Sequence, residues 1–151
     1  MYELDQIDWQ ILTHLQRNAR ASYRELGDLV RLSPPAVAER VRKMEDAGIL
    51  RHYRATVDPK KVGYAVQCFI RLTVHSGRYG SAIATVREMP EVLECHRVTG
   101  DACLLLKVVA MSMEHLERVI DALVPFGQIV TSIVLSSPVP ERPIPSMGAE
   151  G

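Results

Sequence analysis

The spacing of apolar residues changes from helical to strand-like part-way along this 151-residue chain. Near the N-terminus, Ile7, Ile11 and Leu15 recur every four residues, which marks one face of a helix. Farther along, Cys68 and Ile70 belong to a run in which apolar and polar residues alternate, which indicates a half-buried strand. Because one segment cannot satisfy both periods, the sequence predicts a helical N-terminal unit followed by an α+β unit.

Three short helices are predicted within residues 1–50. The first begins at Asp5 or Asp8, because a carboxylate stabilises the positive end of the helix dipole. Ser22 and Glu25 have the spacing of a capping box, in which each side chain satisfies a free backbone N–H group, so a second helix begins there. The residues that this second helix is expected to bury are Leu26, Leu29 and Val30.

The third helix, at about residues 34–47, follows almost at once. Ser33 is a suitable N-cap and Pro34 a suitable first residue, because the first turn of a helix does not use that N–H group. Gly48 is expected to end the helix. The residues expected to be buried are Val37, Val41 and Met44. A tight turn between the second and third helices predicts a helix-turn-helix unit.

One face of the third helix carries candidate DNA-contacting residues. Projection at about 100° per residue puts Pro35, Glu39 and Arg42 opposite the buried stripe. In a helix-turn-helix this helix enters the major groove, where Arg42 is suited to guanine or phosphate. Arg40 lies nearer the packed edge, where it would pair with a phosphate or a neighbouring acid. The candidate DNA-binding residues are Ser22, Ser33, Pro35, Ala36, Glu39, Arg40, Arg42 and Lys43.

The formal net charge is zero, but positive charge is concentrated in the N-terminal half. Between Arg17 and Lys61 there are eleven Lys or Arg residues against six Asp or Glu, whereas from Val62 onward there are seven against nine. This asymmetry favours a polyanionic partner, double-stranded DNA. Residues 49–57 are rich in β-branched and aromatic residues and predict a strand, or wing. Residues 51–63 are assigned to this basic strand and a linker.

Residues 64–137 predict the order βαββαβ, with strands at 66–74, 92–99, 103–110 and 129–136. This order is typical of a ferredoxin-like α+β sandwich with both helices on one face of the sheet. Phe69 and Ile133 would then lie exposed on the other face. An apolar face on so small a domain predicts an interface in a symmetric homo-oligomer. Residues 138–151 contain four prolines and are expected to form a flexible tail.

Several classes of protein are disfavoured. No apolar run approaches the roughly 20 residues of a membrane span, and the acidic N-terminus does not resemble a secretory signal. The three cysteines form no CxxC pair, so the reducing cytoplasm is the predicted compartment. Because GxSxG, Walker and HExxH motifs are missing, we expect a non-enzyme without catalytic residues, metal or cofactor.

Several segments, taken in order, resemble the Lrp/AsnC (feast/famine) family of bacterial and archaeal transcriptional regulators. The resemblance covers about residues 3–136. It rests on LDQIDWQIL at 4–12, RASYREL at 20–26, LSPPAVAERV at 32–41, MEDAGIL at 44–50 and Val98-Thr99-Gly100-Asp101. It implies a winged helix-turn-helix followed by a ferredoxin-like sandwich of the RAM type. It also implies homodimers that join through the C-terminal sheets and assemble further into octamers.

The resemblance further implies an amino acid or related metabolite bound near the turn after the second strand of the sandwich. The candidate effector-binding residues are Thr99, Gly100, Asp101, Ala102 and Cys103. Gly100 permits close backbone approach, and neighbouring N–H groups would hold a carboxylate. Many relatives have an acidic residue, a partner for an α-amino group, where this chain has Cys103. Asp101 would compensate for that loss, or the ligand is a keto acid, or the turn is purely structural.

Two other functions share these features. A sirohaem-decarboxylase-like enzyme has a related fold, and an unregulated DNA-architectural protein would differ only in specificity. Cys68, Cys95, His96 and Cys103 fall on three predicted strands, but they are more typical of core cysteines and an exposed histidine than of a zinc site. The basic third helix favours a cytoplasmic, sequence-specific transcriptional regulator modulated by an amino acid or related small metabolite.

Overall fold

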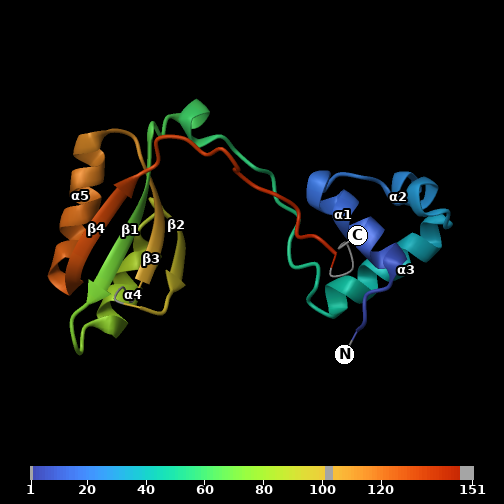
Figure 1. Ribbon diagram of the computed structural model, residues 1–151, viewed down its shortest axis with the longest axis horizontal. Coiled ribbons are helices and arrows are strands. Elements are labelled where there is room, and N and C mark those ends of the chain that lie inside the picture. The colour runs from blue at the N-terminus through green and yellow to red at the C-terminus, as the bar shows by residue number, and fades with distance from the viewer. Residues whose placement is uncertain (1, 101–103, 147–151) are drawn as a thin grey trace. The chain divides into compact units, whose positions relative to one another are not determined.

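The computed structural model describes residues 2–100 and 104–146. The chain divides into two compact units, one made of Met1–Thr56 together with Val139–Gly151 and the other of Val57–Pro138. Each unit has its own hydrophobic core. Figure 1 labels the helices of the first unit and the strands and helices of the second. No helix in the described part of the chain is both long and apolar enough to cross a membrane.

The first helix of the N-terminal unit, α1 (Gln6–Arg17), begins with a reciprocal cap. The Asp8 backbone N–H donates to the Asp5 carboxylate at 2.8 Å, and the Asp5 N–H donates to the Asp8 carboxylate at 3.2 Å. Both acids considered for this helix start therefore act together, because each satisfies a backbone donor that the first turn leaves free. The core below α1 contains Ile11, Leu12 and Leu15.

The two helices that follow begin where the capping residues predict. The second helix, α2 (Tyr23–Val30), has the Ser22–Glu25 capping box, and the third, α3 (Pro34–Asp46), has Ser33 as its N-cap. At the end of α3, the Gly48 N–H donates to the Glu45 carbonyl and the Ile49 N–H to the Met44 carbonyl, both at 2.9 Å. This is a Schellman motif, and the positive φ of 70° at Gly48 is the conformation that glycine adopts without steric cost.

Two predictions for the N-terminal unit are wrong. Leu29 is 51% exposed, because the buried edge of α2 consists of Leu26, Gly27 and Val30 and leaves Leu29 on the outer side. Residues 49–58 form no strand, although their composition favours one. A strand requires a hydrogen-bonded neighbour, and no other segment among the described residues pairs with this one.

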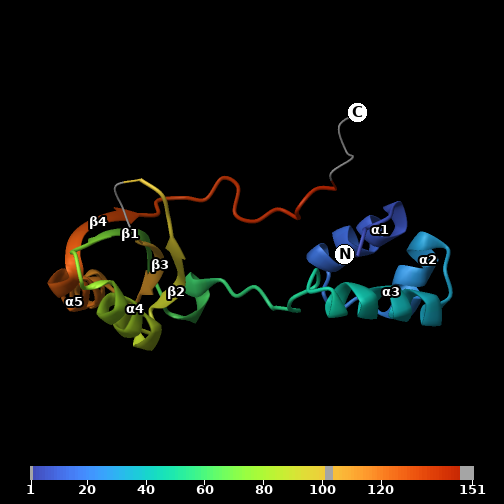
Figure 2. The same ribbon diagram turned by 90° about the horizontal axis from the view of Figure 1, so that it is seen from below.

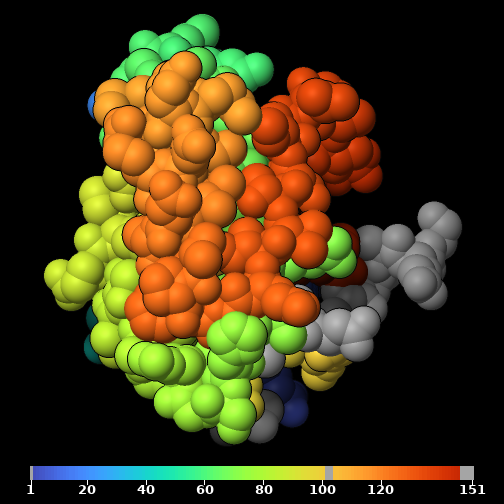
Figure 3. All heavy atoms as spheres, turned by 90° about the vertical axis from the view of Figure 1, so that its left-hand side faces the viewer, coloured from blue at the N-terminus to red at the C-terminus, as the bar shows by residue number. Residues whose placement is uncertain are grey.

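The C-terminal unit has the predicted element order. After a 3-10 turn, η1 (Pro59–Val62), its elements are β1 (Val66–Val74), α4 (Tyr79–Glu88), β2 (Val92–Arg97), β3 (Leu104–Ala110), α5 (Met113–Leu123), η2 (Val124–Phe126) and β4 (Gly127–Ile133). The strands form one antiparallel sheet in the order β2-β3-β1-β4. Both helices lie on one face of the sheet (Figure 2). On one side of the unit α5 lies beside the edge strand β4 (Figure 3).

The core of this unit lies between the helices and the inner face of the sheet. Cys68, Ile70 and Leu72 of β1 point into it, as the alternation predicts. Ile133 is exposed, as expected, but its expected place beside Phe69 on the outer face is wrong. Ile133 pairs with Cys68 in the β1–β4 register, so it lies on the inner face at the end of its strand.

The outer face of the sheet does carry exposed apolar side chains. Phe69 is 40% exposed, and Val130, which lies opposite Arg71 in the register, is 48% exposed. Charged residues share this face, because Lys107 lies opposite Phe69 and donates to the Glu94 carboxylate at 2.9 Å. The outer face therefore combines apolar and paired charged groups.

Candidate nucleic-acid interface and effector turn

The residues that the periodicity of α3 predicts to be exposed do lie on its exposed face. Val37, Val41 and Met44 are fully buried against α1 and α2, whereas Pro35 and Glu39 are exposed. The remaining candidates on this helix are Ala36, which is half-buried, and Arg42 and Lys43, which are exposed. The surface has apolar atoms at the N-terminal end of α3 and both signs of charge in its middle.

Arg42 is paired with acids of its own helix. Its guanidinium donates to the Glu39 carboxylate at 2.8 Å and lies 3.9 Å from the Asp46 carboxylate, and Lys43 lies 3.7 Å from Glu39. The hydrogen bond from Arg42 holds the pKa of Glu39 below its ordinary value. Exposed pairs of this kind contribute little to stability, so exchanging the carboxylate for a DNA phosphate costs little.

Arg40 has a different role, because it joins α3 to the start of α1. Its Nη1 donates to Asp5 Oδ2 and to Asp8 Oδ1, both at 2.8 Å. The Asp8 carboxylate is nearly inaccessible to water, and it also accepts from the Tyr2 hydroxyl at 3.0 Å. Of the two alternatives for Arg40, the structure shows the neighbouring acid.

The same contacts shift the pKa of Asp5. The bond from the Asp8 backbone N–H, and then the bond from Arg40, hold the pKa of the Asp5 carboxyl below its ordinary value. A carboxyl whose pKa is lower in the folded state stabilises the fold above its unfolded pKa, and this contribution is lost as the pH falls through the folded pKa. The contact that joins α3 to the start of α1 is therefore expected to weaken in acid.

The turn between α2 and α3 depends on two residues that the sequence analysis did not single out. Arg31 ends α2 with φ 58° and ψ 43°, a left-handed conformation that is uncommon outside glycine. Gly27 faces the turn, and a Cβ placed there would lie 2.5 Å from the Leu32 carbonyl oxygen. The Leu32 N–H donates to the Gly27 carbonyl at 3.0 Å. The backbone of α2 thus touches the turn directly, and only glycine leaves the necessary room.

The serines chosen as DNA contacts both act as helix caps. The Ser22 hydroxyl accepts from the Glu25 N–H and donates to the Glu25 carboxylate at 2.8 Å. The Ser33 hydroxyl accepts from the Ala36 N–H at 3.4 Å. Both serines remain exposed. They lie at the N-terminal ends of α2 and α3, where backbone N–H groups attract phosphate.

The candidate effector turn is described in part. Thr99 and Gly100 follow β2, and Gly100 has a φ of 99° with open space around its Cα. Asp101, Ala102 and Cys103 lie outside the described residues. The preceding strand is tied to α4, because the Arg97 guanidinium lies over the Tyr79 ring at 5.1 Å. Nothing in the spacing of Tyr79 and Arg97 along the chain signals this contact, so it was not predicted.

Of the four residues considered as a zinc site, Cys103 lies outside the described residues, and the other three do not form a common site. Cys95 packs against the inner core, whereas its neighbour His96 is exposed and bonds to Glu94 at 3.2 Å. Cys68 is buried in β1, and burial raises the pKa of its thiol, which disfavours the thiolate that binds metal. Among the described residues no group of three His, Cys, Asp or Glu side chains is arranged to hold a metal ion.

Comparison with known proteins identifies the family. Residues 4–45 match the AsnC-type helix-turn-helix domain and residues 67–144 match the Lrp/AsnC ligand binding domain. The chain belongs to the Lrp/AsnC family of transcriptional regulators. Its two units are thus a helix-turn-helix and a ligand-binding domain.

Relatives of this Lrp/AsnC regulator match along most of its length. It is 40% identical over 134 residues to the transcriptional regulator LrpC of Bacillus subtilis, which covers 89% of this chain and 93% of the relative. It is 36% identical over 143 residues to the regulatory protein AsnC of Escherichia coli, covering 91% and 94%. Both are named as regulators, which favours that class over the decarboxylase alternative.

Solved structures agree with this assignment. The B. subtilis LrpC structure superposes with a TM-score of 0.87, covering 90% of this Lrp/AsnC regulator and 97% of the relative. A transcriptional regulator from Neisseria meningitidis, determined as its L-methionine complex, is 34% identical and superposes with a TM-score of 0.89, covering 95% and 97%.

Proposed function

We propose that this regulator reads specific DNA sequences through α3, and that an amino acid or related metabolite bound in residues 64–137 modulates its assembly or DNA affinity. The exposed N-terminal half of α3, next to a glycine-dependent turn, carries this proposal. In helix-turn-helix proteins the residues at this place contact base edges. Residues 1–50 are the proposed DNA-binding domain.

Each candidate DNA-binding residue has a chemistry that suits a part of the DNA. Pro35 and Ala36 present methyl and methylene groups that fit a thymine methyl, and Glu39 is suited to the amino group of cytosine. Arg42 and Lys43 supply the positive charge for guanine or phosphate. Ser22 and Ser33 would contact phosphates from the helix N-termini. Arg40, by contrast, positions the helix, because both of its acid partners would have to be given up before it met DNA.

Replacing Arg42 and Lys43 together by alanine is expected to weaken DNA binding without unfolding the protein. Each lost phosphate contact lowers the slope of log affinity against log salt by about 0.9, so the pair would lower it by up to about 1.8. Fluorescence anisotropy with a duplex selected by the wild-type protein, at several salt concentrations, measures this slope.

The matched control is Arg87→Ala, which removes an exposed arginine from α4. It should leave affinity and slope unchanged. Equal affinity and slope in the wild type and the double variant would remove α3 from the interface. Equal affinity of the wild type for the selected duplex and for random DNA would instead favour the architectural function.

The effector proposal is supported by the conformation of the turn after β2. The positive φ of Gly100 leaves the backbone open to a ligand, and a carboxylate would accept from its N–H groups. The L-methionine complex of the Neisseria relative makes an amino acid a reasonable ligand class. Cys103 stands where many relatives have an acid, so a keto acid remains the alternative ligand.

A Gly100→Val variant is expected to lose ligand binding, because a β-branched residue strongly disfavours positive φ and its side chain would fill the open space. Wild-type protein should bind L-methionine or its keto-acid analogue, with a coupling to DNA affinity of about 1–3 kcal/mol.

Cys103→Asp should shift the preference toward the amino acid, because it adds a partner for the amine. Calorimetry with both ligands measures these affinities, and equal binding by wild type and Gly100→Val would place the site elsewhere.

The proposed working form is a cytoplasmic homodimer that assembles to an octamer. Exposed Phe69 and Val130 on the outer sheet face support a dimer interface, because apolar side chains exposed on the sheet of a small domain are often covered by a second subunit. A two-fold dimer would present two reading helices to a two-fold-related DNA site, with half-sites separated by about one helical turn or a multiple of it.

A further inference from the structure

The proline-rich tail after β4 is attached to the DNA-binding unit through one side chain. The Gln16 carboxamide at the end of α1 forms two hydrogen bonds with the backbone of Ile144. Its Oε1 accepts from the Ile144 N–H at 2.7 Å, and its Nε2 donates to the Ile144 carbonyl at 3.3 Å. A carboxamide matches a peptide group in both donor and acceptor, so this pair holds one residue of an extended chain at two points.

The tail sequence favours this mode of attachment. Ile144 lies between Pro143 and Pro145, so its N–H is the one backbone donor in that triplet. Alternating prolines restrict the tail to extended conformations, which lowers the entropy lost on docking. The Ile144 side chain is 70% exposed, so it is the backbone of this residue, and not its apolar side chain, that is held.

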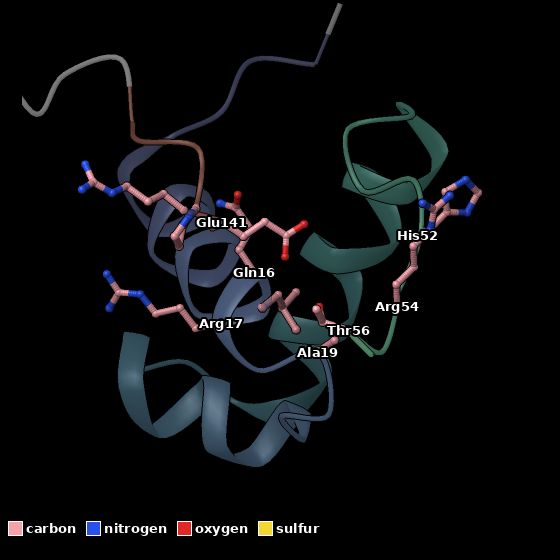
Figure 4. A pocket seen from close by; sticks show the side chains of 10 residues that line it. Gln16, Arg17, Ala19, His52, Arg54, Thr56 and Glu141 are labelled. Atoms are coloured by element: carbon pink, nitrogen blue, oxygen red, sulfur yellow. The ribbon is translucent and has the colours of Figure 1, made fainter. Parts of the chain in front are cut away.

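Little packing supports the tail on either side of the Gln16 contact. A cavity of about 500 Å³ separates residues 141–143 from the end of α1 and from His52, Arg54 and Thr56. Figure 4 shows the Glu141 carboxylate directed into this cavity, while Arg17 points away from it. Beyond Ile144, Ser146 lines a shallow groove with Trp9 and Leu29. The Gln16–Ile144 pair, called the Gln16 latch below, is therefore the principal attachment of the tail.

The latch changes how the two units are connected. With the tail attached, the chain passes between the units twice, once near residue 57 and again near residue 138. With the tail released, the N-terminal unit is joined to the rest of the protein by a single segment of chain, near residue 57. Two connections leave a unit fewer accessible arrangements than one, because each closed loop removes conformational freedom.

We propose that the Gln16 latch makes the tail a second tether, which raises the avidity of the dimer for DNA sites with two half-sites. This inference rests on the proposed DNA-binding function and on the proposed homodimer. When one reading unit of a dimer is bound, the second binds at an effective concentration set by its tethers. Gln16 is a positioning residue here, since it acts on the tether and not on DNA.

Two DNA duplexes test the proposal with the full-length protein. The first carries both half-sites of a sequence selected by the wild type, and the second has one half-site scrambled. Gln16→Ala removes the latch, and a chain ending at Pro138 removes the tail. Gln10→Ala is the matched control, because Gln10 is exposed on α1 and lines the same groove, but forms no hydrogen bond with the described tail. Hydrogen exchange at the Ile144 amide reports directly on the latch.

Gln16→Ala and the shortened chain should bind the two-half-site duplex about tenfold more weakly than wild type, by the loss of effective concentration. Both should bind the single half-site as wild type does, and Gln16→Ala should exchange the Ile144 amide faster. Wild-type binding of both duplexes by both variants would overturn the proposal, as would tighter binding or an equal loss on the single half-site. If the wild type selects no DNA sequence, the proposed function fails, and the tether proposal falls with it.

Discussion

A Gly27→Ala variant is expected to lose stability in the helix-turn-helix unit and, with it, most of its DNA binding. The added Cβ would lie 2.5 Å from the Leu32 carbonyl oxygen, a backbone atom that cannot rotate away. Overpacking of this kind costs about 1–3 kcal/mol, which lowers the melting temperature of a domain of this size by about 10 °C. Relief of the clash would also move α3 away from α2. Calorimetric melting and anisotropy with the selected duplex measure the two effects.

Gly80→Ala is the control for this substitution. Gly80 lies in α4, where an added Cβ would meet open space and φ is not positive. That variant should match the wild type or gain about 0.4–1 kcal/mol, because alanine restricts the unfolded chain. If Gly27→Ala melts and binds DNA as wild type does, the turn can move at no cost, and close backbone approach is not the reason for glycine at this position.

Local rules predicted the helices of this regulator well. Ser22 with Glu25, Ser33 with Pro34, and Gly48 all act where the sequence placed them, because capping involves residues three or four positions apart. The alternation in β1 was equally informative, since it identifies the inner face of one strand without reference to any other. Arg31 departs from these rules, because its left-handed φ is normally signalled by glycine or asparagine.

Features that depend on distant residues were not predictable in the same way. Residues 49–57 have the composition of a strand, but composition does not supply a partner. Ile133 was assigned to the wrong face because its orientation follows from the register with β1, which pairs it with Cys68. Leu29 was expected to be buried, but a helix of eight residues has a narrow buried edge. Because the position of that edge depends on the neighbouring helices, the spacing within α2 did not predict it.

In the candidate site, too, some features follow from local sequence and others depend on distant residues. The exposed face of α3 follows from its own periodicity, so Pro35, Glu39 and Arg42 were placed correctly on it. Arg40 had two possible partners, and the choice depended on acids more than thirty residues away. The Gln16 latch spans 128 positions and carries no local signal.

Replacing Arg40 by methionine is expected to destabilise the N-terminal unit by about 3 kcal/mol, because it leaves the buried Asp8 carboxylate without its cation. DNA binding should fall in proportion to the unfolded fraction. At temperatures where the variant is folded, the salt dependence of binding should equal that of the wild type, because Arg40 is held by acids and is not available to phosphate. Melting curves and salt titrations at two temperatures separate these effects.

Arg42→Met, on the same helix, is expected to have the opposite effects on stability and on the salt dependence of DNA binding. The exposed ion pairs of Arg42 contribute little, so the melting temperature should match that of the wild type, while the salt slope of DNA binding falls. Adding Asp8→Asn to Arg40→Met should recover part of the lost stability, because a carboxamide still accepts from Tyr2 without leaving a buried charge. A lower salt slope in folded Arg40→Met would show that Arg40 does leave its acids for DNA. The distinction between a positioning and a contacting arginine on α3 would then be wrong.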